Sequence, residues 1–302
     1  MPPAAARPAA HPSTSLAAIG AMLLSCVFFA LMALSVGAAQ QRDPSLDTAV
    51  ASLYRAATNL VCVLCIGRFD LRALRGDGRR ALWTRGLWGS ASLLSYFAAL
   101  SHLPIGEGAF LNATSAVWVA GLAPLVLKER TPPEVWIAVV GAIVGVGLLV
   151  EPRGGDGLGR ALGLASGAFA ALAYLSVRQA AATNGPLTVV FYFTGIATVI
   201  CAAWAALSGA PWPTDPHLIG LLVAAGVCAT LGQLLMTRAY QLGRAAPVAA
   251  AGAFGPLLTA ALGAASLGQL PDARGLVGMG VLLLTSTLLP FLGELRARRA
   301  GV

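Results

Sequence analysis

Arg55 is the residue whose type and position could do chemistry most directly. It lies in an apolar run about eight residues beyond the preceding polar loop, roughly 12 Å along a helix. An arginine at that depth in a membrane is costly and is usually functional or paired. Its guanidinium could hold a substrate carboxylate through two hydrogen bonds. The alternative is a structural role, in which Arg55 extends its charged head toward the interface or caps helix ends.

Two segments interrupt apolar runs with residues that weaken a helix. Gly252 to Pro256 combines two glycines with a proline, which removes one backbone hydrogen bond. The polar segment from Asn112 to Ser115 lies 140 residues earlier. Facing breaks near mid-membrane are typical of transporter sites, where freed carbonyls can accept bonds from a substrate ammonium. The alternative is a pair of kinks that only pack helices.

Aromatic residues within the apolar runs could line the same site, because aromatic walls suit flat apolar or cationic ligands. The polar Gln233 lies inside another apolar run. For each such residue, packing in the core or against lipid is the alternative. The candidate substrate-binding residues are Arg55, Tyr96, Asn112, Ser115, Trp118, Tyr174, Gln233, Phe254 and Pro256.

Motifs of enzymes and cofactor sites are absent from the sequence. It has no HExxH, no P-loop and no Gly-x-Ser-x-Gly, and its three histidines are far apart. We therefore expect no catalytic residue, no metal, no cofactor and no ATP-driven step within this chain. The five cysteines lie in apolar runs and are expected to pack as small apolar residues.

The composition predicts that membrane helices position these residues. Of the 302 residues, 57% are apolar and only 11% are charged, unlike a soluble domain. Apolar runs long enough to cross a bilayer recur along the chain, and each must be a helix because no water satisfies a bare backbone there. The predicted spans are 16–39, 48–67, 81–103, 108–127, 133–150, 159–182, 186–208, 218–242, 245–268 and 275–293.

The distribution of positive charge predicts the orientation of these spans. Placing both termini in the cytoplasm puts 15 of the 20 Lys and Arg residues on that side, as the positive-inside rule requires. Arg85 is counted among these cytoplasmic charges. Because the net charge of +8 falls in short loops, we do not expect nucleic-acid binding.

Residues 97–150 and 237–290 share hydropathy and turn positions at an offset of 140 residues. A repeat of five spans would enter the membrane upside down in its second copy, which is the inverted-repeat architecture of secondary transporters. We predict a disordered tail over 1–14, one five-helix repeat over 15–152, a second over 153–293, and a cytoplasmic tail over 294–302.

Short signatures recur in order along nearly the whole chain, from about Ile19 to Leu292. They are Phe28 to Met32, Tyr54-Arg55, Arg85-Gly86, Tyr96 to Leu100, Glu107, Glu129, Arg238 to Tyr240, and Pro256. In order and spacing they resemble the EamA family of the drug/metabolite transporter superfamily. The resemblance implies a ten-helix exporter or facilitator, with the aromatic and neutral amino-acid exporters as the favoured branch. Ala116 and Gln269 depart from the family pattern, which bears on the symmetry of the two halves.

We therefore predict an all-α integral membrane protein of the inner (plasma) membrane, with ten transmembrane helices in two inverted five-helix repeats. It would export small amino acid-like metabolites by alternating access. No Asp, Glu or His lies at the centre of a span, which predicts facilitated diffusion without a proton partner. The alternatives are an exporter of drug-like organic cations or other metabolites and, in another class, an intramembrane enzyme or a non-transporting receptor. The expected partners are a small-molecule substrate and the lipid bilayer, and the oligomeric state stays open.

Overall fold

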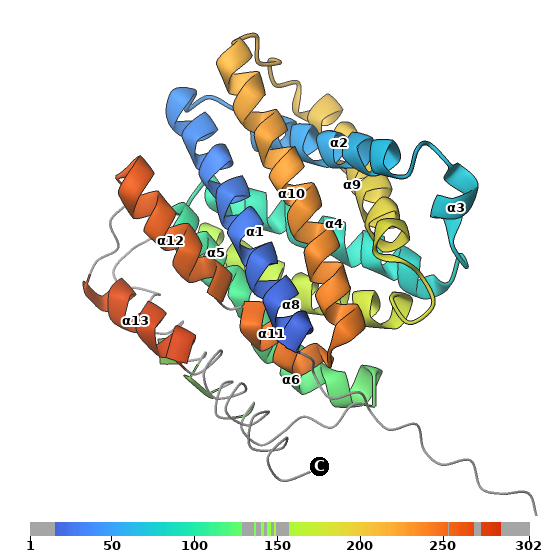
Figure 1. The fold of residues 1–302 in the computed structure, drawn as a ribbon. Coiled ribbons are helices and arrows are strands. Elements are labelled where there is room, and N and C mark those ends of the chain that lie inside the picture. The colour runs from blue at the N-terminus through green and yellow to red at the C-terminus, as the bar shows by residue number, and fades with distance from the viewer. Residues whose placement is uncertain are drawn as a thin grey trace, which may run out of the picture.

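The computed structural model describes residues 16–128, 136, 140, 141, 144, 145, 148, 157–252, 254–268 and 273–284. Every regular element within these ranges is helical (Figure 1). The first half has α1 (Leu16–Arg42), α2 (Thr48–Ile66), α3 (Leu71–Arg75), α4 (Arg80–Leu100), α5 (Ile105–Ala113) and α6 (Ser115–Val126). The second half has α8 (Gly157–Ala180), α9 (Pro186–Ser208), α10 (Pro216–Leu242), α11 (Ala245–Gly252), α12 (Phe254–Leu267) and α13 (Ala273–Leu283).

Seven helical stretches in the described part of the chain are long and apolar enough to cross a membrane, which confirms a multi-pass membrane protein. They are Leu16–Arg42, Thr48–Ile66, Ile105–Val126, Gly157–Ala180, Pro186–Ser208, Pro216–Leu242 and Ala245–Leu267. Each coincides with one predicted span. The predicted span 81–103 corresponds to α4, which carries two arginines and is not among the seven.

Three other sequence predictions fall wholly or partly outside the described residues. Most of the predicted span 133–150 and the last part of 275–293 lie there, as do both predicted tails, 1–14 and 294–302. The count of ten transmembrane helices therefore stays a prediction.

Aspartates in the loops fix where several helices begin. Asp47 caps α2, with its carboxylate accepting from the backbone N–H of Ala49 at 2.7 Å. Asp215 caps α10 and accepts from the N–H of His217 at 3.0 Å. These two aspartates lie at the N-caps, and the helices that they cap, α2 and α10, contain no Asp or Glu themselves.

Helices of the first half pack closely on helices of the second. In Figure 1, α1 and α10 run side by side, and α4 packs in the same way on α8. A glycine permits the approach of α1 to α10, because a Cβ on Gly232 would lie 2.9 Å from the Phe29 ring. Gly226 does the same for α2, since a Cβ there would lie 3.2 Å from the Arg55 carbonyl oxygen. The two halves therefore enclose the space between them.

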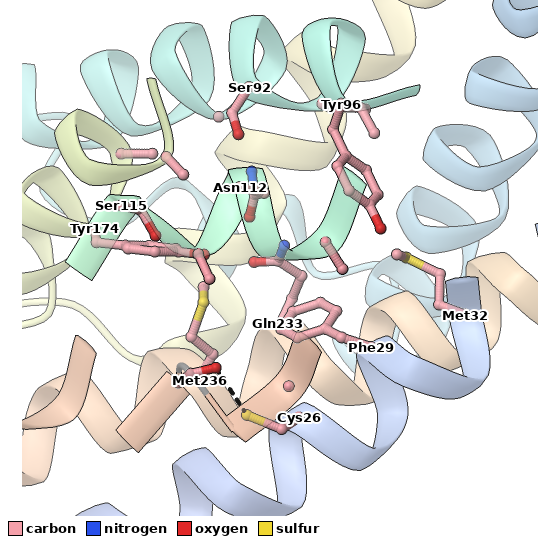
Figure 2. Close-up of a pocket in the computed structure, with 18 of the residues that line it drawn as sticks. Cys26, Phe29, Met32, Ser92, Tyr96, Asn112, Ser115, Tyr174, Gln233 and Met236 are labelled. Atoms are coloured by element: carbon pink, nitrogen blue, oxygen red, sulfur yellow. Dashed lines mark hydrogen bonds between the residues drawn. The ribbon is translucent and has the colours of Figure 1, made fainter. Parts of the chain in front are cut away.

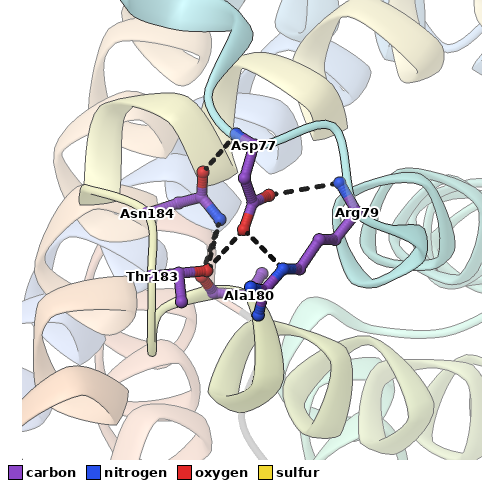
Figure 3. A network of polar contacts seen from close by, with 5 residues as sticks. All are labelled: Asp77, Arg79, Ala180, Thr183 and Asn184. Carbon is purple, nitrogen blue, oxygen red and sulfur yellow. Dashed lines mark hydrogen bonds and ion pairs between the residues drawn. The ribbon is translucent and has the colours of Figure 1, made fainter.

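Polar clusters join the two halves at opposite ends of the bundle. At one end, Thr183 donates to the Asp77 carboxylate at 2.6 Å, and the Asp77 N–H donates to Asn184 Oδ1 at 3.0 Å (Figure 3). This cluster ties the segment before α4 to the segment after α8. At the other end, Arg42 at the end of α1 pairs with Asp215 before α10.

Candidate substrate site

A cavity of about 160 Å³ lies between the two halves. The described helices α1, α2, α4, α5, α6, α8, α9, α10, α11 and α12 all contribute to its wall. Figure 2 shows polar side chains such as Ser92, Asn112 and Gln233 beside the aromatic and thioether groups of Phe29, Tyr174 and Met236. This mixture of apolar walls and a few polar groups is typical of small-molecule sites.

The structure brings most of the predicted site residues together. The cavity is lined by Arg55, Tyr96, Asn112, Ser115, Tyr174, Gln233 and Pro256. Trp118 and Phe254 are not part of its wall. Trp118 is 49% exposed on α6, and Phe254 is partly buried at the start of α12. Both follow a helix break, where the rotation of the next helix decides which side chains face the cavity.

Arg55 enters the cavity from α2 and is only 5% exposed. Its Nε donates to the sulfur of Met32 at 3.1 Å, which is a weak acceptor. The guanidinium carbon lies 5.7 Å from the centre of the Phe97 ring. The buried Nη1 has no hydrogen-bond partner among the described residues. Nη1 is therefore a hydrogen-bond donor that a bound ligand could use.

Arg85 is a cavity residue that sequence reasoning missed. It is 2% exposed on α4, and its Nη2 donates to Gln233 Oε1 on α10 at 2.7 Å. Its guanidinium carbon lies 4.2 Å from the centre of the Phe193 ring. Gly89 makes room for it, because a Cβ there would collide with the guanidinium. The signal was available, since Arg85 lies inside the predicted span 81–103, as Arg55 lies inside 48–67.

The two predicted helix breaks lie at the cavity wall. The first separates α5 from α6 at Thr114, whose hydroxyl donates to the carbonyl of Leu111 at 2.7 Å. The second separates α11, which ends at Gly252, from α12, which begins at Phe254. The Gly252 carbonyl accepts from the Cys26 thiol on α1 at 3.5 Å (Figure 2). One carbonyl freed by the break is thus held by α1.

Two neutral polar residues of the wall, Asn112 and Ser92, are held by hydrogen bonds to Ser166 on α8. Asn112 Nδ2 donates to Ser166 Oγ at 2.9 Å, and Ser92 Oγ donates to the Ser166 carbonyl at 2.9 Å. These bonds join α4 and α5 to α8. They fix the wall and leave the two arginines as its charged groups.

Charge in the cavity is of one sign. Its lining contains Arg55 and Arg85 but no Asp, Glu or His among the described residues. Glu107 on α5 instead pairs with Arg160 at 3.1 Å, away from the lining. No group of His, Cys, Asp and Glu suited to a metal ion occurs within the described ranges. The arrangement can bind an anionic group between aromatic walls.

The model of the EamA-like transporter family matches this chain twice, over residues 16–151 and 157–290. The chain belongs to this family. Each of the two EamA-like matches covers one of the halves that meet around the cavity. It also agrees with the prediction of a transporter.

Relatives of this EamA-like protein include two named transporters. It is 30% identical over 272 residues to the pseudopaline exporter CntI of Pseudomonas aeruginosa strain UCBPP-PA14, covering 89% of this chain and 93% of that protein. It is 27% identical over 183 residues to the riboflavin transporter of Rhizobium johnstonii, covering 60% of each. The preference for the aromatic and neutral amino-acid branch stays a prediction.

A solved crystal structure has the same fold as this EamA-like chain. The TM-score is 0.67 at 18% identity, and the match covers 94% of this chain and 99% of the other. At that identity the likeness concerns the fold alone.

Proposed function

We propose that this EamA-like protein exports small amino acid-like metabolites, aromatic ones included, across the inner membrane by alternating access. The observation that carries the proposal is the buried guanidinium of Arg55, with an unpartnered Nη1, at a cavity formed by both halves. A substrate carboxylate would take that donor in a charge-assisted bond. Tyr96, Tyr174 and Phe193 supply aromatic walls for an apolar side chain.

Alternating access would follow from an inverted repeat. Two family-model matches of similar length support the repeat. At an offset of 140 residues α1 corresponds to α8 and α4 to α10, so the packing of α1 on α10 mirrors that of α8 on α4. The ion pair of Arg42 with Asp215 and the cluster around Asp77 join these helix pairs at opposite ends. Breaking one and keeping the other would open the cavity to one side at a time.

We further propose that transport is facilitated diffusion without an obligatory proton. Coupling to protons needs a group that gains and loses a proton in reach of the cavity. The described cavity lining has no carboxylate and no imidazole. Glu107, a carboxylate in the first turn of α5, forms an ion pair with Arg160 at 3.1 Å.

An exporter of drug-like organic cations is the second candidate, because aromatic walls suit cations as well. The two buried arginines oppose it, since a cation would enter beside like charges in a medium of low dielectric constant. They favour a ligand with at least one anionic group.

Reconstitution tests the proposal. Purified protein in liposomes is offered a panel of labelled amino acids, aromatic and aliphatic, with empty liposomes as the control. We expect saturable uptake of at least one zwitterion, and no net accumulation when substrate is equal on both sides and a pH gradient is imposed. Sustained uphill uptake that a protonophore abolishes would contradict uncoupled transport. Transport of organic cations and of no amino acid would favour the second candidate.

A further inference from the structure

Arg55 and Arg85 approach one aromatic ring from two different helices. The guanidinium carbon of Arg55 lies 5.9 Å from the centre of the Phe193 ring, and that of Arg85 lies 4.2 Å from it. Both side chains are more than nine-tenths buried, at 5% and 2% exposure. Both line the same cavity. A single small ligand can therefore meet both guanidinium groups.

Each of these arginines keeps a buried donor without a partner. Nη1 of Arg55 and Nε of Arg85 make no hydrogen bond to any described residue. A buried polar group left unbonded is costly, and a buried charge without a counter-ion costs more. Two like charges near one ring also repel each other where water is scarce.

Three other arginines have acidic partners. Arg42 pairs with Asp215, Arg79 with Asp77, and Arg160 with Glu107. These pairs lie at the ends of helices or in loops. Arg85 instead bonds the neutral Gln233, which orients the guanidinium without cancelling its charge.

We propose that the cavity is built for a substrate with two carboxylates, one taken by Arg55 and the other by Arg85. The proposal rests on the proposed function and deepens it, since it names an amino acid-like metabolite with a second acidic group as the preferred substrate. A substrate with one carboxylate leaves the other guanidinium unpaired. The neutral wall residue Gln233 is a positioning residue for Arg85.

The test compares two probes of nearly equal shape. N-(carboxymethyl)phenylalanine has two carboxylates, and N-(carbamoylmethyl)phenylalanine replaces one of them by an amide. Binding of each to purified protein in detergent is measured by titration calorimetry. We expect wild type to bind the dicarboxylate at least about tenfold tighter, because charge-assisted bonds are roughly twice as strong as neutral ones.

Variants assign that preference to the arginines. Gln233→Glu places a carboxylate beside Arg85 with almost no change of shape, and it should abolish the preference for the dicarboxylate. Arg85→Gln should do the same, whereas Arg85→Lys should keep part of the preference because it keeps the charge. Arg80→Gln is the matched control, since Arg80 is exposed at the start of the same helix. It should bind as wild type does.

Three results would overturn the proposal: equal affinity of wild type for the two probes, an unchanged preference in Gln233→Glu, and a lost preference in Arg80→Gln. Counterflow of labelled phenylalanine in liposomes separates this failure from failure of the proposed function. Counterflow without a dicarboxylate preference refutes the two-carboxylate site and leaves amino-acid transport standing. A dicarboxylate preference in a protein that moves neither phenylalanine nor the dicarboxylate supports the site and refutes transport. Binding of neither probe, with no counterflow, refutes both.

Discussion

Replacing Arg55 by methionine separates a substrate-binding arginine from a structural one. Methionine keeps an unbranched stem of similar length in the buried position on α2 and removes the charge. If Arg55 has a structural role, replacing it should destabilise the protein even without substrate. If Arg55 binds substrate, replacing it should reduce transport and leave the stability of the substrate-free protein intact.

The contacts of Arg55 set the size of the expected effect on stability. The bond from Nε to the Met32 sulfur is a single bond to a weak acceptor, worth at most about 1 kcal/mol. The rings of Phe97 and Phe193 lie 5.7 and 5.9 Å away, near the limit of useful cation–π attraction. Together these two cation–π contacts contribute about 1–2 kcal/mol of further stabilisation. Against this, removing a buried charge without a counter-ion relieves a penalty of about several kcal/mol.

We therefore expect Arg55→Met to be as stable as wild type without substrate, or more stable by up to about 3 kcal/mol. Thermal denaturation of the purified protein in detergent measures this, and Arg80→Met is the control at an exposed position. Transport in liposomes by the same preparation should be lost. If Arg55→Met is destabilised by about 3–5 kcal/mol, as expected on breaking a satisfied buried charge, the reasoning is wrong and Arg55 is structural.

Three more predictions follow from other parts of the structure. In a background without native cysteines, Ala73→Cys and Thr214→Cys, both at exposed positions, should react with an impermeant reagent from opposite sides of the membrane; labelling of both from one side would overturn the topology. Gly226→Ala should lower the free energy of unfolding by about 1–3 kcal/mol, because its Cβ would press on Thr58 and on the Arg55 carbonyl, while Gly220→Ala, with open space around it, should be neutral. Equal effects of the two substitutions would contradict the close packing of α2 on α10. The hydrogen bond from Thr183, and then that from Asn184, hold the pKa of the Asp77 carboxyl below its ordinary value. The stabilisation that the Asp77 carboxylate contributes to the folded protein is therefore complete above the unfolded-state pKa of this carboxyl group. It is lost as the pH falls through the lower folded-state pKa. Asp77→Asn should thus denature at a lower temperature than wild type at neutral pH, with a difference that shrinks in acid; a difference independent of pH would count against this cluster.

Much of the site could be predicted from local sequence. A charge inside an apolar run is visible without a structure, so Arg55 could be identified from its depth. Helix-weakening residues are equally local, and both predicted breaks lie at the cavity wall. The seven membrane-length helices follow from hydropathy in the same way.

The rest depends on how helices rotate and pair. Sequence analysis places Arg85 among the cytoplasmic charges because it lies near the start of its span, and its partner Gln233 is 148 residues away. Only the packing of α4 against the second half brings that pair together. Trp118 and Phe254 lie just beyond helix breaks, where hydropathy does not tell which face meets the cavity. Thr183 and Asp77 could not be paired from sequence, because loops at the two positions meet only in the folded bundle.

The central claim is that the chain moves small amino acid-like metabolites through the cavity that holds Arg55. Counterflow in liposomes tests it most directly: excess unlabelled substrate is trapped inside, trace labelled substrate is added outside, and no ion gradient is present. For wild type we predict transient accumulation of label above equilibrium, and for Arg55→Met at equal reconstituted amounts we predict none. Absence of counterflow in wild type for every amino acid and dicarboxylate tested, or equal counterflow in Arg55→Met, would contradict it.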